Sequence, residues 1–232
     1  KQGKPPTCAP LARRHRGGPE AEPRGEVYSC DRPREQAAKL FAEMEAILKA
    51  HAELNDRCNV LRFKKEIEVL SGDGEGSIYM ALSADAGSKM GLSPSFVVYD
   101  ELGSAPNRAL FDAMDTATGA RDNPLMMVIS TQAAADHAVM SELIDYGEKV
   151  NAGDVPDPSF HCTLYAAPDG DDPWDPLTWA MENTAIGDFR SREDVQRPAA
   201  PARLVPSKEL TVSHQRLTQR LSPVAGFISQ DE

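Results

Sequence analysis

Two adjacent carboxylates at the end of an apolar segment are the residues of this sequence with the clearest chemical potential. Residues 96–99 (Phe-Val-Val-Tyr) form a continuous run of strand-forming side chains, and Asp100 and Glu101 follow directly. Such a run is typical of a strand covered on both faces, as in a parallel sheet flanked by helices. Ligands of these sheets bind beyond the carboxyl ends of the strands. The pair would therefore lie where a divalent cation and a reacting water could be held.

The carboxylate pair has two interpretations. In nucleotide hydrolases an aspartate at this point, in the element called Walker B, fixes Mg²⁺, and the glutamate beside it polarises the attacking water. Alternatively, Asp100 and Glu101 are solvated acids at the end of a buried strand, which is a common arrangement. The elements around the pair help to decide between the two.

Hydrophobic periodicity indicates several elements before the pair. Apolar residues from Ala37 to Leu48 recur at three-and-four spacing and predict an amphipathic helix, whose start Asp31 could cap. Residues 25–29, 60–63, 66–70 and 78–82 are predicted as strands, with a glycine-rich turn at 71–76.

The elements after the pair predict a strand–helix–strand unit. Residues 107–118 are predicted as a helix with Leu110, Phe111 and Met114 facing inward, and 125–130 as a second buried strand. Strands joined by a crossover helix run parallel, so their carboxyl ends share one edge of the sheet. Ser130 and Thr131 should therefore lie at the same edge as Asp100. Residues 139–150 are predicted as a further helix and 160–166 as a strand.

Composition limits the classes of protein to consider. The 232 residues carry a net charge of −11, and no apolar run approaches the roughly 20 residues that span a bilayer. The start does not resemble a signal peptide. The four cysteines form no C-x-x-C pair, which argues against a zinc site or a disulfide framework and favours reduced thiols in a cytoplasm. An acidic chain also argues against extended phosphate binding by this chain alone.

The composition changes toward the carboxyl end. Prolines and alanines gather after Arg197, and one helix is predicted at about 208–221. We therefore expect a main α/β domain over residues 1–186, followed over 187–232 by a linker and a helical extension.

Several stretches in this order resemble the large terminase subunit of tailed bacteriophages, the motor that packages DNA into proheads. The resemblance covers most of residues 25–230 and rests on residues 26–29, 36–37, 82–86, 91–102, 119–121, 129–132, 179 and 185–189. It implies a P-loop ATPase with a mostly parallel sheet flanked by helices, followed by a metal-dependent nuclease domain.

The resemblance also implies residue roles and partners. Asp100 would be the Walker B residue for Mg²⁺, Glu101 the catalytic carboxylate, and Ser130-Thr131 the motif that couples ATP hydrolysis to motion. Arg108 and Arg121 are candidates to offset charge on the transferred phosphoryl group. The implied partners are double-stranded phage DNA, a portal protein, a terminase small subunit and further copies in a ring. The expected setting is virion assembly, from a phage or a prophage, in the bacterial host cytoplasm.

Two features depart from the family pattern. Residues 1–4 match the end of a Walker A loop, with Gly3 and Lys4 as nucleotide-binding residues, but Pro5 replaces the hydroxyl residue that would contact Mg²⁺. Pro10 would lie inside the helix that follows, at a cost of about 3 kcal/mol. The basic run at 13–16 replaces apolar residues, and we interpret it as an altered remnant rather than a DNA-binding patch.

At the other end, the nuclease carboxylates are not found in this sequence. We therefore expect a portion of a packaging motor that is incomplete at both ends. The alternative is a catalytically inactive remnant that acts only in assembly or binding.

Overall fold

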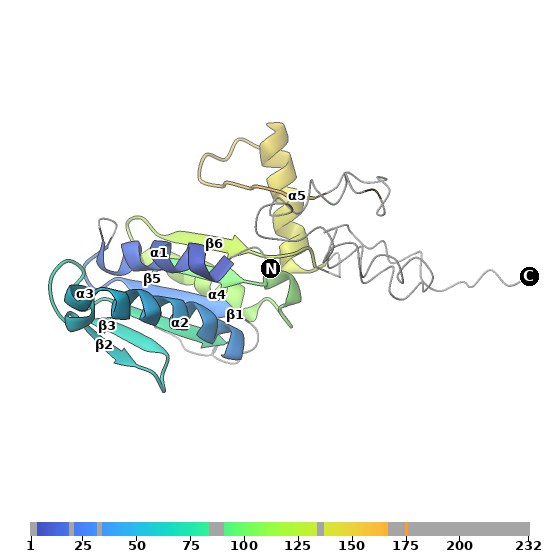
Figure 1. Ribbon diagram of the computed structural model, residues 1–232. Helices are drawn as coiled ribbons and strands as arrows, with labels where there is room; N and C mark the ends of the chain where they lie inside the picture. The colour runs from blue at the N-terminus through green and yellow to red at the C-terminus, as the bar shows by residue number, and fades with distance from the viewer. Residues whose placement is uncertain are drawn as a thin grey trace, which may run out of the picture. The chain divides into compact units, whose positions relative to one another are not determined.

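The computed structural model describes residues 4–18, 21–31, 34–83, 91–133, 137–166 and 175 of the chain (Figure 1). The chain divides into two compact units, one that ends at Ser130 and one that begins at Thr131. The predicted domain boundary near residue 186, the linker and the carboxyl-terminal helix lie outside the described residues.

A single mixed sheet organises the first unit. Its six strands run in the order β2-β3-β4-β1-β5-β6. They are β1 (Glu26–Asp31), β2 (Cys58–Leu61), β3 (Glu66–Val69), β4 (Ile78–Ser83), β5 (Pro94–Asp100) and β6 (Leu125–Ile129). The four strands β4, β1, β5 and β6 are parallel, whereas β2 and β3 form an antiparallel hairpin beside β4. The predicted α/β fold with a mostly parallel sheet is confirmed.

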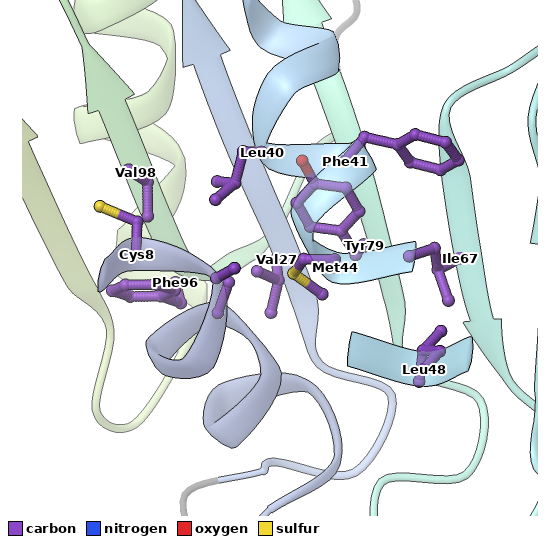
Figure 2. Close-up of a cluster of buried hydrophobic side chains, with 12 residues drawn as sticks. Cys8, Val27, Leu40, Phe41, Met44, Leu48, Ile67, Tyr79, Phe96 and Val98 are labelled. Atoms are coloured by element: carbon purple, nitrogen blue, oxygen red, sulfur yellow. The ribbon is translucent and has the colours of Figure 1, made fainter. Parts of the chain in front are cut away.

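The helices α1 (Lys4–Gly17) and α2 (Arg34–Ala50) cover one face of this sheet, and the short helix α3 (Ala52–Asp56) follows α2. The core between them and the strands consists of Cys8, Ala9, Ala12, Val27, Leu40, Phe41, Met44, Leu48, Ile67, Tyr79, Phe96 and Val98 (Figure 2). Phe96 and Val98 alternate with Val97 and Tyr99 along β5, so the latter two point to the opposite face. Both faces of β5 are buried, which explains its continuous apolar sequence.

The helix α4 (Ala109–Ala117) packs on the opposite face. Leu110, Phe111 and Met114 are buried, as predicted, and the ring of Phe111 lies 6.4 Å from that of Tyr99. Cys30 also points to the face covered by α4. Its neighbour Ser29 points to the other face, under α1 and α2, where its hydroxyl lies 2.7 Å from that of Tyr79. Successive residues of a strand point to opposite faces. None of the described helices is both long and apolar enough to cross a membrane.

The helix α1 forms in spite of its unfavourable composition. Pro10 lies inside it, as expected, but is exposed, so its ring does not disturb the packed side. The buried side consists of small residues and one arginine: Cys8, Ala9, Ala12 and Arg16. Arg16 donates a hydrogen bond from Nη1 to Cys58 Sγ at 3.3 Å. The last residue of the basic run at 13–16 therefore belongs to the buried side of the helix.

Strand β6 differs from its prediction. It pairs in parallel with β5, as expected, but lies at the end of the described sheet, and Leu125 is 47% exposed. The expectation that residues 125–130 form a fully buried strand is therefore wrong. An apolar sequence alone does not say whether a strand has one neighbour or two.

The second unit contains the predicted helix α5 (Val139–Ala152). Residues 160–166 contact it without forming a strand, so that prediction is wrong: a strand needs a hydrogen-bonded neighbour, and the described residues supply none. Instead, Phe160 packs edge-on against Tyr146 at 4.9 Å, and Asn151 donates to the carbonyl oxygen of Cys162 at 3.1 Å.

Gly147 makes this contact possible, because a Cβ there would stand 2.5 Å from Cys162 Sγ. We expect Gly147→Ala to lower the free energy of unfolding of this unit by about 1–3 kcal/mol through overpacking. Gly119→Ala is the matched control, since a Cβ at Gly119 meets nothing within 4 Å. Urea unfolding monitored on α5 measures both variants, and equal midpoints would contradict the prediction.

Candidate functional site

The carboxyl ends of β1, β5 and β6 lie side by side. Cys30 of β1 is paired with Tyr99 of β5, and Asp100 is paired with Ile129 of β6. The side chains that end or follow these strands are Asp31, Asp100, Glu101 and Ser130. The structure thus brings Ser130 to the edge of the sheet where Asp100 and Glu101 lie, as the strand–helix–strand pattern predicted.

Asp31 is a residue of this edge that the sequence interpretation assigned differently. It is the last residue of β1 and only 4% exposed, whereas α2 begins three residues later, at Arg34. Its proposed role as a helix cap stays a prediction, because residues 32 and 33 lie outside the described residues. The signal that identified Asp100, an acid directly after an apolar strand, would also have identified Asp31. Burial, with the charge of Asp31 beside it, raises the pKa of the Cys30 thiol.

Glu101 adopts an unusual backbone conformation. Its φ of 56° and ψ of 40° place it in the left-handed region, where residues with a Cβ lose about 1–2 kcal/mol. It precedes a short 3-10 turn, η2 (Leu102–Ser104), and its carbonyl oxygen accepts a hydrogen bond from the Ser104 N–H at 2.9 Å. Strained residues of this kind gather at functional sites.

The turn after Glu101 is attached to the end of β6. The Glu101 N–H donates to the carbonyl oxygen of Ile129 at 2.9 Å, which extends the β5–β6 ladder by one bond. The Gly103 N–H then donates to Ser130 Oγ at 2.7 Å. Ser130 therefore contacts the turn that carries Glu101. Thr131 is the first residue of the second unit.

The amino-terminal end of α1 points toward the same edge. His15, near the end of α1, stacks at 4.4 Å on Phe96 near the start of β5, and Cys8 belongs to the buried cluster that includes Val98 further along. The helix and the strand thus run in opposite directions, and Lys4, the first residue of α1, lies toward the carboxyl end of β5. Gly3 lies outside the described residues.

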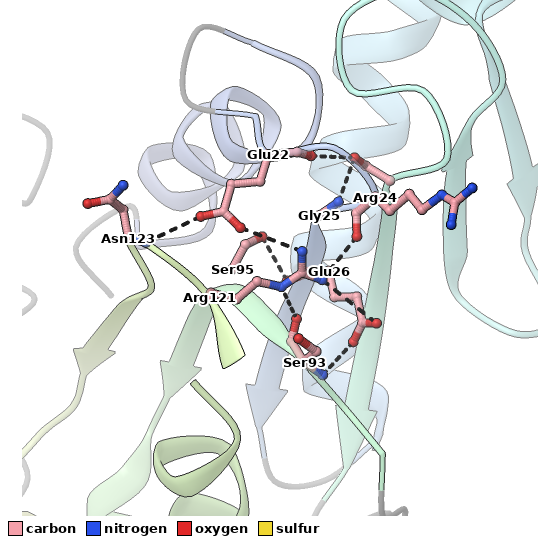
Figure 3. Close-up of polar contacts among 9 residues, drawn as sticks. Glu22, Arg24, Gly25, Glu26, Ser93, Ser95, Arg121 and Asn123 are labelled. Carbon is pink, nitrogen blue, oxygen red and sulfur yellow. Dashed lines mark hydrogen bonds and ion pairs between the residues drawn. The ribbon is translucent and has the colours of Figure 1, made fainter. Parts of the chain in front are cut away.

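The two candidate arginines occupy different places. Arg121 binds at the amino ends of β1 and β5, the edge opposite Asp100 (Figure 3). Its Nε donates to the Ser93 carbonyl oxygen at 2.7 Å and its Nη2 to that of Arg24 at 3.0 Å. Arg108 instead follows the Glu101 turn, is exposed, and forms an ion pair with Asp112 at 2.8 Å. The structure does not bring Arg121 to the carboxylate pair within this chain.

The donors at this edge suit a magnesium ion bound together with a nucleotide. Among the described residues, no cluster of three or more histidines, cysteines or acids could hold a metal by itself. Mg²⁺, however, is commonly held by one or two carboxylates together with phosphate oxygens and waters. Asp100 at the end of β5 fits this pattern.

Comparisons with known proteins show which family this chain is similar to. The family model for the terminase large subunit, ATPase domain, matches residues 16–149. The large terminase subunit of Enterobacteria phage HK97 is 36% identical over 232 residues, which are 99% of this chain but 44% of that protein. The crystal structure of the HK97 large terminase superposes with a TM-score of 0.83 at 35% identity, covering 99% of this chain and 47% of that one.

A more distant structure shares the fold. The ATPase domain of the Thermus phage P74-26 large terminase has a TM-score of 0.59 at 15% identity and covers 95% of this chain and 85% of its own. This chain spans less than half of the HK97 protein.

Proposed function

The chain belongs to the terminase large subunit family, and we propose that it is the ATPase portion of an ATP-driven DNA-packaging motor. The observation that carries this proposal is the edge where Asp100 and Glu101 end β5 beside Ser130, with the start of α1 directed to the same side. A helix amino terminus attracts phosphate groups, and carboxylates there can hold the accompanying cation.

Each residue has a role in the proposed reaction. Lys4 would contact the phosphates of ATP, and Asp100 would hold Mg²⁺, which offsets negative charge on the phosphoryl group when bound. Glu101 would orient the attacking water and take up its proton. Ser130 and Thr131 would couple hydrolysis to motion. Of the two arginines, Arg108 remains the candidate for phosphoryl contact, because Arg121 is engaged at the opposite edge.

The proposed partners follow from family membership. They are double-stranded DNA, a portal protein, a terminase small subunit and further copies of this chain in a ring, within the host cytoplasm. The net charge of −11 argues against DNA binding over one broad surface of this chain alone, and leaves contact through a few loops or as a member of a ring.

One observation favours a second candidate function, assembly or binding without catalysis. Pro5 and Pro6 fall in the first turn of α1 and have no N–H, so two amide groups that could bind phosphate are missing. Pro5 also lacks the hydroxyl that a Walker A motif places on the metal.

Equilibrium binding of a fluorescent ATP analogue, with and without Mg²⁺, separates the two functions. We expect micromolar, Mg²⁺-dependent binding that weakens at least tenfold in both Lys4→Ala and Asp100→Ala, because each removes a charge that is proposed to contact the phosphates or the metal. Lys64→Ala and Asp73→Ala, which change exposed residues in turns, are the controls. No binding by a folded wild-type chain would favour the assembly function instead.

A further inference from the structure

We propose that Ser130 is a positioning residue for Glu101, holding the turn at residues 101–104 in place through the Gly103 N–H. This inference deepens the proposed ATPase function, on which its catalytic consequence rests. The contact itself is a feature of the fold and can be tested without any turnover.

The hydrogen bond joins two segments that are distant in sequence. Ser130 Oγ lies 2.7 Å from the Gly103 nitrogen, although the two residues are 27 positions apart. Backbone pairing between β5 and β6 ends where the Glu101 N–H meets the Ile129 carbonyl oxygen at 2.9 Å. After this last backbone bond, the Ser130 hydroxyl is the next acceptor, and it binds the N–H of Gly103. A side chain thus continues the attachment where the strand pairing stops.

The hydrogen bond between Ser130 and Gly103 helps to hold Glu101 in its strained conformation. A glutamate in the left-handed region persists only where its surroundings hold it there. The Glu101 N–H precedes the strained φ and ψ angles of Glu101, and the Gly103 N–H follows them. Both N–H groups donate to acceptors at the end of β6. Removal of the Ser130 hydroxyl would break one of these two hydrogen bonds. Glu101 could then relax toward the dihedral angles usual for a residue with a Cβ. The Glu101 carboxylate would move with the turn.

The expected kinetic effect is specific. Glu101 is proposed to act on the attacking water, not to hold the nucleotide, so a misplaced carboxylate reduces stabilisation of the transition state. Loss of the Ser130 hydroxyl should therefore lower kcat and leave KM for ATP unchanged. A threonine retains the hydroxyl on a similar stem, and Ser130→Thr should recover most of the lost rate.

The test compares Ser130→Ala and Ser130→Thr with Ser95→Ala. Ser95 is a matched control, because its hydroxyl also makes one partly buried hydrogen bond from β5, to the Glu26 carbonyl oxygen at 3.1 Å, but at the opposite edge. Amide hydrogen exchange by NMR reports on the contact. Exchange of the Gly103 amide should accelerate about threefold to tenfold in Ser130→Ala, the range of one net hydrogen bond, and stay unchanged in the other two variants.

A second variant links the contact to the strain. Glycine adopts the left-handed conformation readily, so the turn in Glu101→Gly needs less support. Ser130→Ala should then accelerate Gly103 exchange less in the Glu101→Gly background than in the wild type. Equal acceleration in both backgrounds would mean that Ser130 does not support the strained residue, and the proposal would be overturned.

Turnover measurements complete the design. With an active wild type, Ser130→Ala should reduce kcat about tenfold or more with KM within twofold, and Ser130→Thr should restore it. Unchanged Gly103 exchange, or faster exchange with unchanged kcat, would refute the positioning role. A wild-type chain without turnover would count against the ATPase proposal only, because the exchange measurements would still decide whether Ser130 holds the turn.

Discussion

Glu101→Gln is expected to reduce ATP turnover by about 10²- to 10⁴-fold while nucleotide affinity stays within about twofold of the wild type. The amide has nearly the shape of the carboxylate but cannot accept the proton of the attacking water. Because the proposed role of Glu101 begins only when water attacks, binding of ATP should not depend on its charge. Steady-state turnover beside binding of a fluorescent ATP analogue measures the two quantities, and Glu75→Gln, in the exposed turn before β4, is the control.

The backbone at Glu101 adds a test of the same site that is independent of turnover. Glu101→Gly should be about 1 kcal/mol more stable than Glu101→Ala, because glycine adopts φ near 56° without the clash of a Cβ. Urea unfolding compares the two inactive variants. Turnover that survives in Glu101→Gln would remove this residue from the reaction, whereas equal stability of the glycine and alanine variants would mean that no strain is stored there.

Arg121→Ala is expected to lower the free energy of unfolding by about 2–4 kcal/mol without a direct effect on the carboxylate pair. The guanidinium joins the Ser93 and Arg24 carbonyl oxygens, and forms ion pairs with Glu22 at 3.5 Å and Glu26 at 3.9 Å. Only 14% of its side chain is exposed, and its bond to the Ser93 carbonyl oxygen is partly buried, whereas its bond to the Arg24 carbonyl oxygen is exposed. A partly buried bond from a charged donor contributes about 1.5–3 kcal/mol, and the exposed bond and the ion pairs add about 0–1 kcal/mol.

The partners of Arg121 make further contacts, so removal of Arg121 should also weaken the residues that contact them. Glu26 Oε2 also accepts hydrogen bonds from the Tyr28 hydroxyl and the Ser93 N–H, both at 2.7 Å. Burial, together with the bond to Glu26, raises the pKa of Tyr28. Arg121 therefore stabilises a network that fixes the amino ends of β1 and β5.

Two further variants, compared with Arg121→Ala by urea unfolding, test the Arg121 prediction. Arg121→Lys should recover only part of the loss, since an ammonium group cannot span the same acceptors as a guanidinium. Arg108→Ala should change the free energy of unfolding by about 0.5 kcal/mol or less, because its i,i+4 pair with Asp112 is exposed. Similar losses in Arg121→Ala and Arg108→Ala would show that the network adds no stability.

The sequence predicted the elements whose own residues carry a periodic signal. The helix α2, the strand β5 and the helix α4 each have apolar residues at a spacing that matches one secondary structure, and each was found. Position within the sheet was not predictable in this way, because the exposure of β6 depends on which strands pair with it. Residues 160–166 have strand-like composition, but composition cannot provide a hydrogen-bonded neighbour.

The site was predictable in its residue types and not in its geometry. Asp100 and Glu101 were found from their place after an apolar run, and Ser130 from the strand–helix–strand pattern. The left-handed conformation of Glu101 has no local signal, since glycine or asparagine would be expected there. The bond between Ser130 and Gly103 is long-range, and the network around Arg121 joins three segments that only the fold brings together, namely residues 22–26, Ser93 and Arg121 itself.

Two cysteines are buried on opposite faces of the sheet, so their alkylation would report when the helices on each face separate from the strands. Cys8 faces the sheet from α1 in one layer and Cys30 lies in the layer covered by α4, and both are buried, whereas Cys58 and Cys162 are partly exposed. An alkylating reagent would therefore modify the latter two first. The order in which Cys8 and Cys30 then react, read by peptide mass spectrometry, would identify the layer that separates first from the sheet, with no residue replaced.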